Sequence, residues 1–344
     1  MPSVRGRCKP GAVCYARGMA AKQIRIGVVG AGHFGRFHAL KVAASPRAAL
    51  AGLHDTDPAR AAAVGREAGG APALGLDALL AACDAVVIAA PADMHHALAT
   101  RALEAGRHVL VEKPIAATLA QADALAALAA ARGLVLQVGH LLRFSAEHRA
   151  ISERIARPLY IEATRIAPYK PRGTDVSVIL DLMIHDLDLV LALVDSEIEG
   201  VDAMGAAVSS ANEDIANARV RFANGCVAAI TASRISIKTE RRMRLFSQEG
   251  YLSADFGARK LVMIGRERGL PLPGTGGFRR EEISWRDHDA MEAEHAAFVA
   301  ACLDGAPVLV DAAAGRRALA AALAVAESMA ASSARVRASG LVRD

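Results

Sequence analysis

The stretch that decides the fold is residues 24–39, which read Ile24-Arg25-Ile26-Gly27-Val28-Val29-Gly30-Ala31-Gly32-His33-Phe34-Gly35-Arg36-Phe37-His38-Ala39. A short apolar strand leads here into three glycines and the start of a helix, an arrangement that binds a dinucleotide. The first glycine permits a tight turn, the second lets backbone approach a pyrophosphate, and the third lets helix and strand pack closely. The phosphates would lie on the helix N–H groups. We therefore expect the cofactor to contact Gly30, Gly32, His33, Phe34 and Gly35.

A second apolar segment, residues 49–54, ends at Asp55, which follows Gly30 by 25 residues. An acidic residue near this position accepts hydrogen bonds from the adenosine ribose hydroxyls and repels a 2′-phosphate. The sequence therefore predicts NAD as the cofactor. Arg60 lies close by and is a residue type that tolerates a phosphate, so the cofactor class is better supported than the preference for NAD over NADP.

Length and composition set outer limits on the protein. A chain of 344 residues with 53% hydrophobic and 22% charged residues predicts a globular protein with two domains. The net charge of +5 comes from scattered basic residues without interleaved aromatics, which argues against nucleic-acid binding and suits a small anionic substrate. Polar residues interrupt the alanine-rich segments near 116–131 and 318–331, so we expect no membrane span.

The five cysteines lack the spacing of a metal site, and no other pattern predicts a metal. An odd number of cysteines, two of them in apolar surroundings, is typical of free thiols in a reducing cytoplasm. They are Cys8, Cys14, Cys83, Cys226 and Cys302. Residues 1–21 give no structural signal, and we expect either a disordered extension or a natural start at Met19.

The hydrophobic pattern divides the rest of the chain into two halves. Strands and helices alternate up to residue 139, which predicts a parallel sheet covered on both faces. The expected strands are 24–29, 49–54, 85–89, 108–112 and 135–138, and the expected helices are 34–44, 58–68, 95–105 and 119–131. Beyond residue 158, turns such as Asn224-Gly225 join consecutive strands into an antiparallel sheet. These strands are expected at 160–167, 200–209, 215–222, 226–233, 242–248 and 251–255, with helices at 181–193, 290–303 and 311–331. The predicted class is α/β, with a Rossmann domain over 22–139 and a substrate-binding and oligomerisation domain over 140–344.

Two clusters carry residues suited to catalysis. Glu112-Lys113-Pro114 follows a predicted strand, which places Lys113 at the edge where open α/β sheets bind ligands. Asp181 and His185 are four residues apart and share a face if the segment is helical, so the carboxylate can orient the imidazole. Taken alone, the lysine also fits a surface position and the pair also fits a helix salt bridge.

Together these motifs resemble the glucose-fructose oxidoreductase, inositol dehydrogenase and rhizopine-catabolism (Gfo/Idh/MocA) family, over nearly all of residues 22–331. The markers occur in order: the glycine loop with His38 after it, Asp55, residues 90–95, Glu112-Lys113-Pro114 and Asp181-x-x-x-His185. The resemblance implies a Rossmann domain, an open-faced antiparallel sheet used for oligomerisation, and nicotinamide-dependent chemistry at a sugar carbon. It implies catalytic roles for Lys113, Asp181 and His185, and cofactor contacts for Pro91, His95, Glu112 and Lys113.

Residues 139–144, 168–177 and 181–188 are also similar to bacterial UDP-N-acetylglucosamine 3-dehydrogenases, which supply lipid A precursors. That similarity implies oxidation of a nucleotide sugar at C3. Basic residues around the expected cleft are of the kind that binds a diphosphate, although a solvated basic face would look the same. The predicted substrate contacts are Arg143, Arg165, Tyr169, Lys170 and Arg172.

In the predicted mechanism His185 takes the hydroxyl proton, Asp181 orients its imidazole, and Lys113 stabilises the oxygen. The alternatives are a dehydrogenase or reductase for inositol or a free sugar and, from another class, a non-catalytic NAD-binding regulator. Alternating apolar residues in the strands from 200 to 233 lead us to expect an exposed apolar sheet face and a homodimer or homotetramer.

Overall fold

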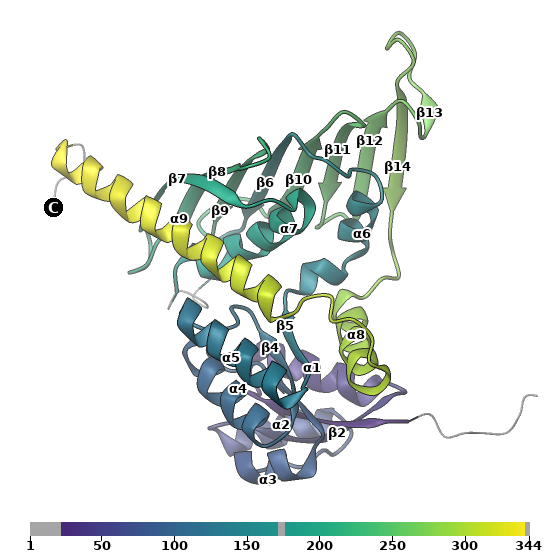
Figure 1. Ribbon diagram of the computed structural model, residues 1–344, viewed down its shortest axis with the longest axis vertical. Coiled ribbons are helices and arrows are strands. Elements are labelled where there is room, and N and C mark those ends of the chain that lie inside the picture. The colour runs from purple at the N-terminus through teal and green to yellow at the C-terminus, as the bar shows by residue number, and fades with distance from the viewer. Residues whose placement is uncertain (1–21, 171–175, 341–344) are drawn as a thin grey trace, which may run out of the picture.

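The computed structural model describes residues 22–170 and 176–340. Two sheets lie one above the other in Figure 1, with the N-terminal part of the chain below and the larger sheet above. The extension expected over residues 1–21 lies outside the described residues, as do Cys8 and Cys14.

The N-terminal sheet is parallel and has the strand order β2-β1-β3-β4-β5. The chain leaves β1 toward β2 on one side and returns to β3 on the other, so a ligand-binding crevice opens between these two directions. The apolar runs expected from the sequence are buried because helices cover both faces, and all four residues of β3 are inaccessible. The strands are β1 (Ile24–Val29), β2 (Ala48–His54), β3 (Ala85–Ile88), β4 (His108–Glu112) and β5 (Leu136–Gly139).

The helices of this domain begin and end at recognisable signals. In α5 (Leu119–Arg132), Thr118 and Gln121 form a reciprocal capping box, and Gly133 ends the helix in the left-handed conformation. Asp57 caps α2 (Pro58–Glu67) through two backbone N–H groups. The short α3 (Leu76–Ala82) was not predicted, because seven residues give little periodicity. The remaining helices are α1 (His33–Ala44), the turn η1 (Ala92–Met94) and α4 (His95–Glu104).

The second sheet has nine strands in the order β13-β14-β12-β11-β10-β6-β9-β8-β7. It is antiparallel except that β6 and β9 pair in parallel, which corrects the expected purely antiparallel sheet. The last three strands were not predicted. The strands are β6 (Tyr160–Ile166), β7 (Ile198–Ala206), β8 (Ile215–Phe222), β9 (Val227–Ser233), β10 (Glu240–Phe246), β11 (Gly250–Asp255), β12 (Lys260–Gly265), β13 (Leu270–Pro271) and β14 (Arg279–Ser284).

The two faces of this sheet differ in chemistry. In β8 the residues Ala216, Ala218 and Val220 are buried, while Asn217 and Arg219 between them are exposed. The alternating apolar side chains therefore belong to the core and do not form the exposed patch that we expected. The reason is that a period of two identifies one apolar face without saying which face the helices cover.

The helices after β5 connect the two sheets. They are η2 (Leu141–Phe144), α6 (Ala146–Ser152), α7 (Ile184–Val194), α8 (Ala290–Asp304) and α9 (Ala312–Ala338). On α8, Phe298 and Val299 are buried in the core around β1 and β2, and the start of α9 packs beside β5 and α5. The strands before residue 140 form the first sheet and those after it form the second, while the chain returns to the N-terminal sheet near its end (Figure 1).

The long helix α9 crosses the junction and continues over α7 and β7 (Figure 1). Ser328 donates to the carbonyl of Val201 and accepts from the N–H of Ala203, which occupies the free edge of β7. By length and composition alone α9 is apolar enough to cross a membrane, which is weak evidence for a span. In this structure α9 packs against β7, α7 and α5.

Candidate active site

The glycine loop at the end of β1 has the shape expected of a dinucleotide cradle. Gly30 has φ +92°, and a Cβ there would lie 2.5 Å from the carbonyl oxygen of Ala89. A Cβ on Gly35 would overlap the carbonyl oxygen of Gly30, whereas one on Gly32 would meet nothing within 4 Å. Open space therefore lies beside Gly32, at the N-terminus of α1, where His33 and Phe34 are exposed. These residues fit a pyrophosphate.

Asp55 lies beside this loop, directly after β2. One carboxylate oxygen accepts from the N–H of Ala31 at 2.7 Å and the other from the N–H of Asp57 at 2.8 Å. Burial acts to raise the pKa of Asp55, but these hydrogen bonds and the charge of Arg60 outweigh it and lower the pKa. The ionised carboxylate keeps further acceptor positions for ribose hydroxyls.

Lys113 extends from the end of β4 to the helical segment that carries the other predicted catalytic residues. Its Nζ donates to the carbonyl oxygens of Asp181 at 2.8 Å and Leu180 at 3.3 Å. Burial lowers the pKa of Lys113, while the carboxylates of Asp181 and Glu112 act in the opposite direction. Two backbone carbonyls thereby hold the ammonium group of Lys113 in place.

The segment around Asp181 is a π-helical turn, Ile179–Met183, which precedes α7. Such turns occur frequently at functional sites. The wider turn changes the angular offset between positions 181 and 185, and no hydrogen bond joins Asp181 to His185 among the contacts of the described residues. The expected orientation of the imidazole by Asp181 is therefore absent from this structure, and Nδ1 of His185 is buried without a hydrogen-bond partner in the described part of the chain.

The environment of His185 favours the neutral imidazole. Burial, together with the charges of Lys113 and Arg165, lowers the pKa of His185 well below its ordinary value. A neutral ring is the form that accepts a proton from a hydroxyl.

A further buried histidine, His140, follows β5 and was missed as an active-site residue. Gly139 pairs with Glu112, so His140 and Lys113 follow neighbouring strands at the same sheet edge. Nδ1 of His140 is 3.8 Å from a carboxylate oxygen of Asp188, whose other oxygen is 3.4 Å from Nη1 of Arg143. Burial raises the pKa of Asp188, and the nearby His140 and Arg143 partly offset this shift. The sequence signal was the position of His140 directly after a parallel strand.

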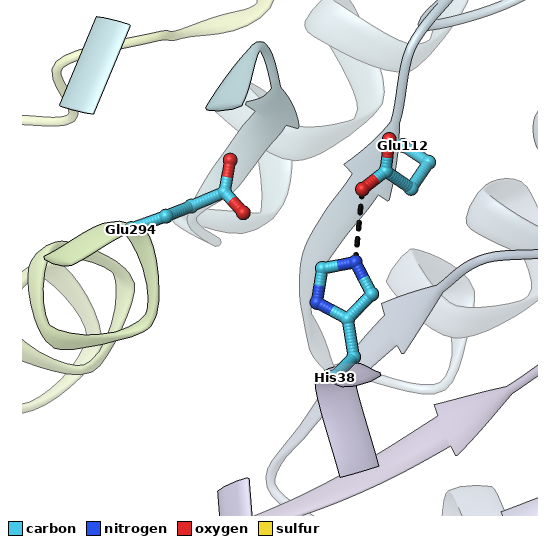
Figure 2. A group of neighbouring side chains, drawn as sticks. All are labelled: His38, Glu112 and Glu294. Atoms are coloured by element: carbon cyan, nitrogen blue, oxygen red, sulfur yellow. Dashed lines mark hydrogen bonds and ion pairs between the residues drawn. The ribbon is translucent and has the colours of Figure 1, made fainter. Parts of the chain in front are cut away.

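Behind Lys113 lies a buried cluster of His38, Glu112 and Glu294, shown in Figure 2. Nε2 of His38 is 2.9 Å from Glu112, and Nδ1 of His38 is 2.9 Å from Nε2 of His295. Glu294 on α8 points toward this pair, and burial with the nearby charge of Glu112 raises the pKa of Glu294 well above its ordinary value. The cluster thus carries a single carboxylate charge next to Lys113, and Glu112 supports the lysine rather than lying in the open cleft.

The loop after β3 contains Pro91, which is exposed, and leads to His95, which is buried. The ring nitrogens of His95 lie 2.7 Å from the carbonyl oxygen of Pro114 and 2.9 Å from that of Ala90. His95 therefore ties this loop to the segment that carries Lys113. The structure gives it a supporting position instead of the direct cofactor contact that we expected.

The predicted substrate-binding residues fall into three groups. Arg165 is buried and bonds to both carboxylate oxygens of Asp186 at 2.8 Å, and Arg143 lies beside Asp188. Both arginines therefore have carboxylate partners within the protein. Arg165 stabilises α7 through its bonds to Asp186. Tyr169 and Lys170 are exposed after β6, and Arg172 lies outside the described residues.

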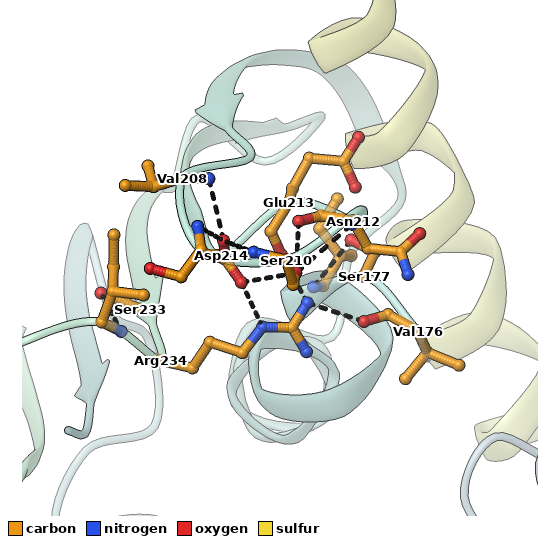
Figure 3. Close-up of polar contacts among 12 residues, drawn as sticks. Val176, Ser177, Val208, Ser210, Asn212, Glu213, Asp214, Ser233 and Arg234 are labelled. Carbon is orange, nitrogen blue, oxygen red and sulfur yellow. Dashed lines mark hydrogen bonds and ion pairs between the residues drawn. The ribbon is translucent and has the colours of Figure 1, made fainter. Parts of the chain in front are cut away.

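The π-helical turn is held from the sheet side by the buried pair of Asp214 and Arg234 (Figure 3). Asp214 accepts from the backbone N–H groups of residues 208–210, and Nε of Arg234 donates to it at 2.9 Å. Nη2 of Arg234 donates at 2.8 Å to the carbonyls of Val176 and Glu213, and the Glu213 carbonyl also accepts from the N–H of Val178. These contacts hold the start of the π-helical turn in place. We did not predict the pair of Asp214 and Arg234 from the sequence.

Comparison with known proteins places this arrangement in a family. Residues 24–140 match the oxidoreductase family with an NAD-binding Rossmann fold, and residues 150–253 match the GFO/IDH/MocA C-terminal domain. UDP-N-acetylglucosamine 3-dehydrogenase of Acidithiobacillus ferrooxidans is 44% identical over 303 residues, which cover 88% of this chain and 96% of that protein. A solved structure of that enzyme has a TM-score of 0.85 and 43% identity, covering 90% of this chain and 98% of its own.

More distant relatives act on cyclic polyols. Inositol 2-dehydrogenase of Rhizobium meliloti is 29% identical over 325 residues, 89% of this chain and 97% of that protein. A scyllo-inositol dehydrogenase from Lactobacillus casei, solved with bound NAD(H), shares the fold with a TM-score of 0.74 and 23% identity over 90% of this chain and 98% of its own. The resemblance predicted from the sequence is confirmed: this chain belongs to the Gfo/Idh/MocA family of NAD-binding oxidoreductases.

Proposed function

We propose that this protein oxidises the C3 hydroxyl of UDP-N-acetylglucosamine to the 3-keto sugar with NAD, in the supply of lipid A precursors. The observation that carries the substrate is the 44% identity to a UDP-N-acetylglucosamine 3-dehydrogenase along 88% of the chain. The site supports the chemistry, because Lys113 and His185 lie together at the carboxyl edge of the Rossmann sheet.

When bound, NAD supplies the acceptor for the hydride that leaves the sugar carbon. Gly30, Gly32, Gly35 and Asp55 bind and align it, with His33 and Phe34 at the helix N-terminus and Pro91 on the neighbouring loop.

His185 accepts the hydroxyl proton, since burial and the neighbouring cations hold its imidazole neutral. Lys113 donates a hydrogen bond to the reacting oxygen and stabilises the charge that develops on it. Asp181 contributes through its carbonyl, which fixes Nζ of Lys113 at 2.8 Å. This differs from the role as an imidazole partner that the sequence suggested.

Of the substrate contacts predicted from the sequence, Tyr169 and Lys170 are exposed after β6, and Arg172 follows in the sequence. Arg143, another predicted substrate contact, lies 3.4 Å from Asp188. We leave Arg165 out of this set because Asp186 occupies its guanidinium.

An inositol or free-sugar dehydrogenase is the second candidate, favoured by the relatives that act on inositol. A regulator without turnover is disfavoured, because a binding protein has no need of a buried neutral histidine beside Lys113. We further propose a cytoplasmic homodimer or homotetramer that binds neither nucleic acid nor membrane.

A substrate comparison tests the proposed function. The purified full-length chain is mixed with NAD and, separately, UDP-N-acetylglucosamine, free N-acetylglucosamine or myo-inositol, and formation of reduced nicotinamide is followed by absorbance. We expect turnover with the nucleotide sugar and little with the other two. Equal rates with free N-acetylglucosamine would overturn the nucleotide-sugar assignment, and turnover of inositol alone would establish the second candidate.

A further inference from the structure

A cavity of about 140 Å³ opens between the second sheet and the segment that follows β5. Its apolar wall is formed by Trp285, Phe256 and Leu142. Two arginines, Arg241 and Arg259, line it as well, and both are exposed to solvent. An aromatic wall with guanidinium groups at its rim is the kind of surface that binds a planar base next to a phosphate.

The cavity lies beside the catalytic segment. Arg241 on β10 is directly opposite Arg165 on β6, and opposed residues of an antiparallel pair project from the same face. Arg165 pairs with Asp186, the neighbour of His185. The charge of Arg241 also contributes to the low pKa of His185. A substrate whose sugar binds at His185 can therefore place its attached phosphate group at Arg241.

The size and charge of the cavity limit what it can hold. A cavity of about 150 Å³ accommodates one six-membered ring, so a nucleobase fits and a whole nucleotide does not. The wall also includes His288, whose Nε2 lies 2.7 Å from the carbonyl oxygen of Phe144, and the carboxylate of Glu147. Two guanidiniums against one carboxylate leave a net positive charge, which favours a phosphate at the rim.

We propose, on the basis of the proposed function, that this cavity binds the nucleoside diphosphate end of the sugar substrate, with the base ring against Trp285 and the diphosphate on Arg241 and Arg259. The remaining sugar then points toward His185 and Lys113. This assignment places the diphosphate at the rim of a cavity, whereas the described residues directly after β6 do not line that cavity, and it uses the run of basic residues that begins at Arg241.

Trp285 is the single tryptophan of the sequence and reports directly on the cavity. UDP, uridine and inorganic diphosphate are titrated into the full-length protein while its tryptophan fluorescence is followed. We expect saturable quenching by UDP, weaker binding of uridine, and markedly less quenching of the Arg259→Gln variant at the same UDP concentrations. Unchanged fluorescence with UDP would overturn the proposal, as would quenching that is the same in Arg259→Gln.

Steady-state kinetics provide an independent readout. Arg241→Gln and Arg259→Gln are each expected to raise KM for UDP-N-acetylglucosamine about tenfold or more, as for the loss of a charge-assisted hydrogen bond, with little change in NAD affinity. The matched control is Arg242→Gln, because Arg242 is the next residue of β10 and lies near Glu240 and Asp255. Lys170→Ala tests the competing position after β6.

The outcomes separate this proposal from the proposed function. If the wild type oxidises UDP-N-acetylglucosamine and only Lys170→Ala raises KM, the cavity assignment fails and the function stands. If UDP quenches Trp285 but no UDP-sugar is oxidised, the proposed function fails and the cavity remains a nucleotide site. Circular dichroism of each variant verifies that the fold is retained.

Discussion

At the scale of single residues, the chemistry depends on burial more than on residue type. His185 is an ordinary histidine in sequence, and its low pKa comes from the surrounding helices and from the charges of Lys113 and Arg165. Lys113 is likewise shifted by burial and held by two backbone carbonyls. These surroundings make a proton acceptor and a hydrogen-bond donor available together near neutral pH.

The first residue-scale prediction concerns these two groups. His185→Ala and Lys113→Ala should each lower kcat by roughly 10²- to 10⁴-fold, the usual effect of losing a positioned acid-base group. NAD affinity, measured by calorimetry, should change little because neither residue lies near Asp55. Because a base acts unprotonated and the pKa of His185 is lowered, kcat/KM of the wild type should stay on its plateau below pH 6.5. Full activity of His185→Ala would contradict the mechanism.

The second residue-scale prediction concerns Asp55. Asp55→Ala removes a charge that repels a 2′-phosphate and an acceptor for ribose hydroxyls, and also the hydrogen bond to the glycine loop at Ala31. We expect weaker NAD binding and a smaller difference between NAD and NADP, measured as dissociation constants. Asp57→Ala, which removes only the cap of α2, is the control. Tighter binding of NADP than of NAD by the wild type would refute the assignment.

At the scale of elements, the candidate site is formed by residues at the C-terminal ends of strands. The glycine loop, Asp55, Lys113 and His140 each follow one of four strands of the five-stranded sheet, and the π-helical turn meets them from the other domain. Backbone contacts fix this turn on both sides, through Lys113 on one side and the pair of Asp214 and Arg234 on the other. Removing one partner of a buried ion pair is costly because the other charge remains buried.

The element-scale prediction follows from that cost. Arg234→Gln should lower the free energy of unfolding by about 3–5 kcal/mol, measured by urea denaturation, and lower kcat through displacement of the π-helical turn. The control is Arg221→Gln, since Arg221 forms an exposed pair with Asp202 and should cost about 0–1 kcal/mol. Similar losses for the two variants would show that the buried pair does not anchor the turn.

At the scale of the whole molecule, the outer face of the nine-stranded sheet carries mixed chemistry. The ring of Phe246 lies there in tilted contact with Tyr160 and Tyr251, with centroids 5.8 and 5.1 Å apart, and Glu162 pairs with Arg244 close by. An aromatic group surrounded by charged residues is typical of the centre and rim of a protein interface. This face replaces the apolar patch on which our assembly prediction rested, and the predicted homo-oligomer now depends on it.

The prediction at this scale is that Phe246→Arg dissociates the homodimer or homotetramer. Phe246 is 38% exposed at the centre of the aromatic group, and an arginine there would bring unpaired charge into the interface. Light scattering at micromolar concentration measures the mass, and Leu309→Arg, on an exposed loop beside the N-terminal domain, is the control. A monomeric wild type would exclude assembly through this face.

The sequence by itself determined the elements whose signals are local. Gly30 and Gly35 report backbone positions where a Cβ has no room, and the strands around them are continuous apolar runs, so the Rossmann domain and its cofactor could be predicted. Order along the chain also led to the predicted catalytic roles of Lys113 and His185. Local signals were weak for β13, which has only two residues, and for β14, whose sequence RREEIS is mostly charged. The apolar run of β12 was overlooked.

Only the tertiary structure decided which side chains meet. The partners of Arg165, Glu112 and Asp214 lie 20 to 74 residues away in sequence, so their pairing depends on how the elements pack. The π-helical turn separates Asp181 from His185 although their spacing fits an α-helix. The position of the helices determines which face of β8 is buried. Burial and pairing are properties of the packed chain, and they convert common residue types into an active site.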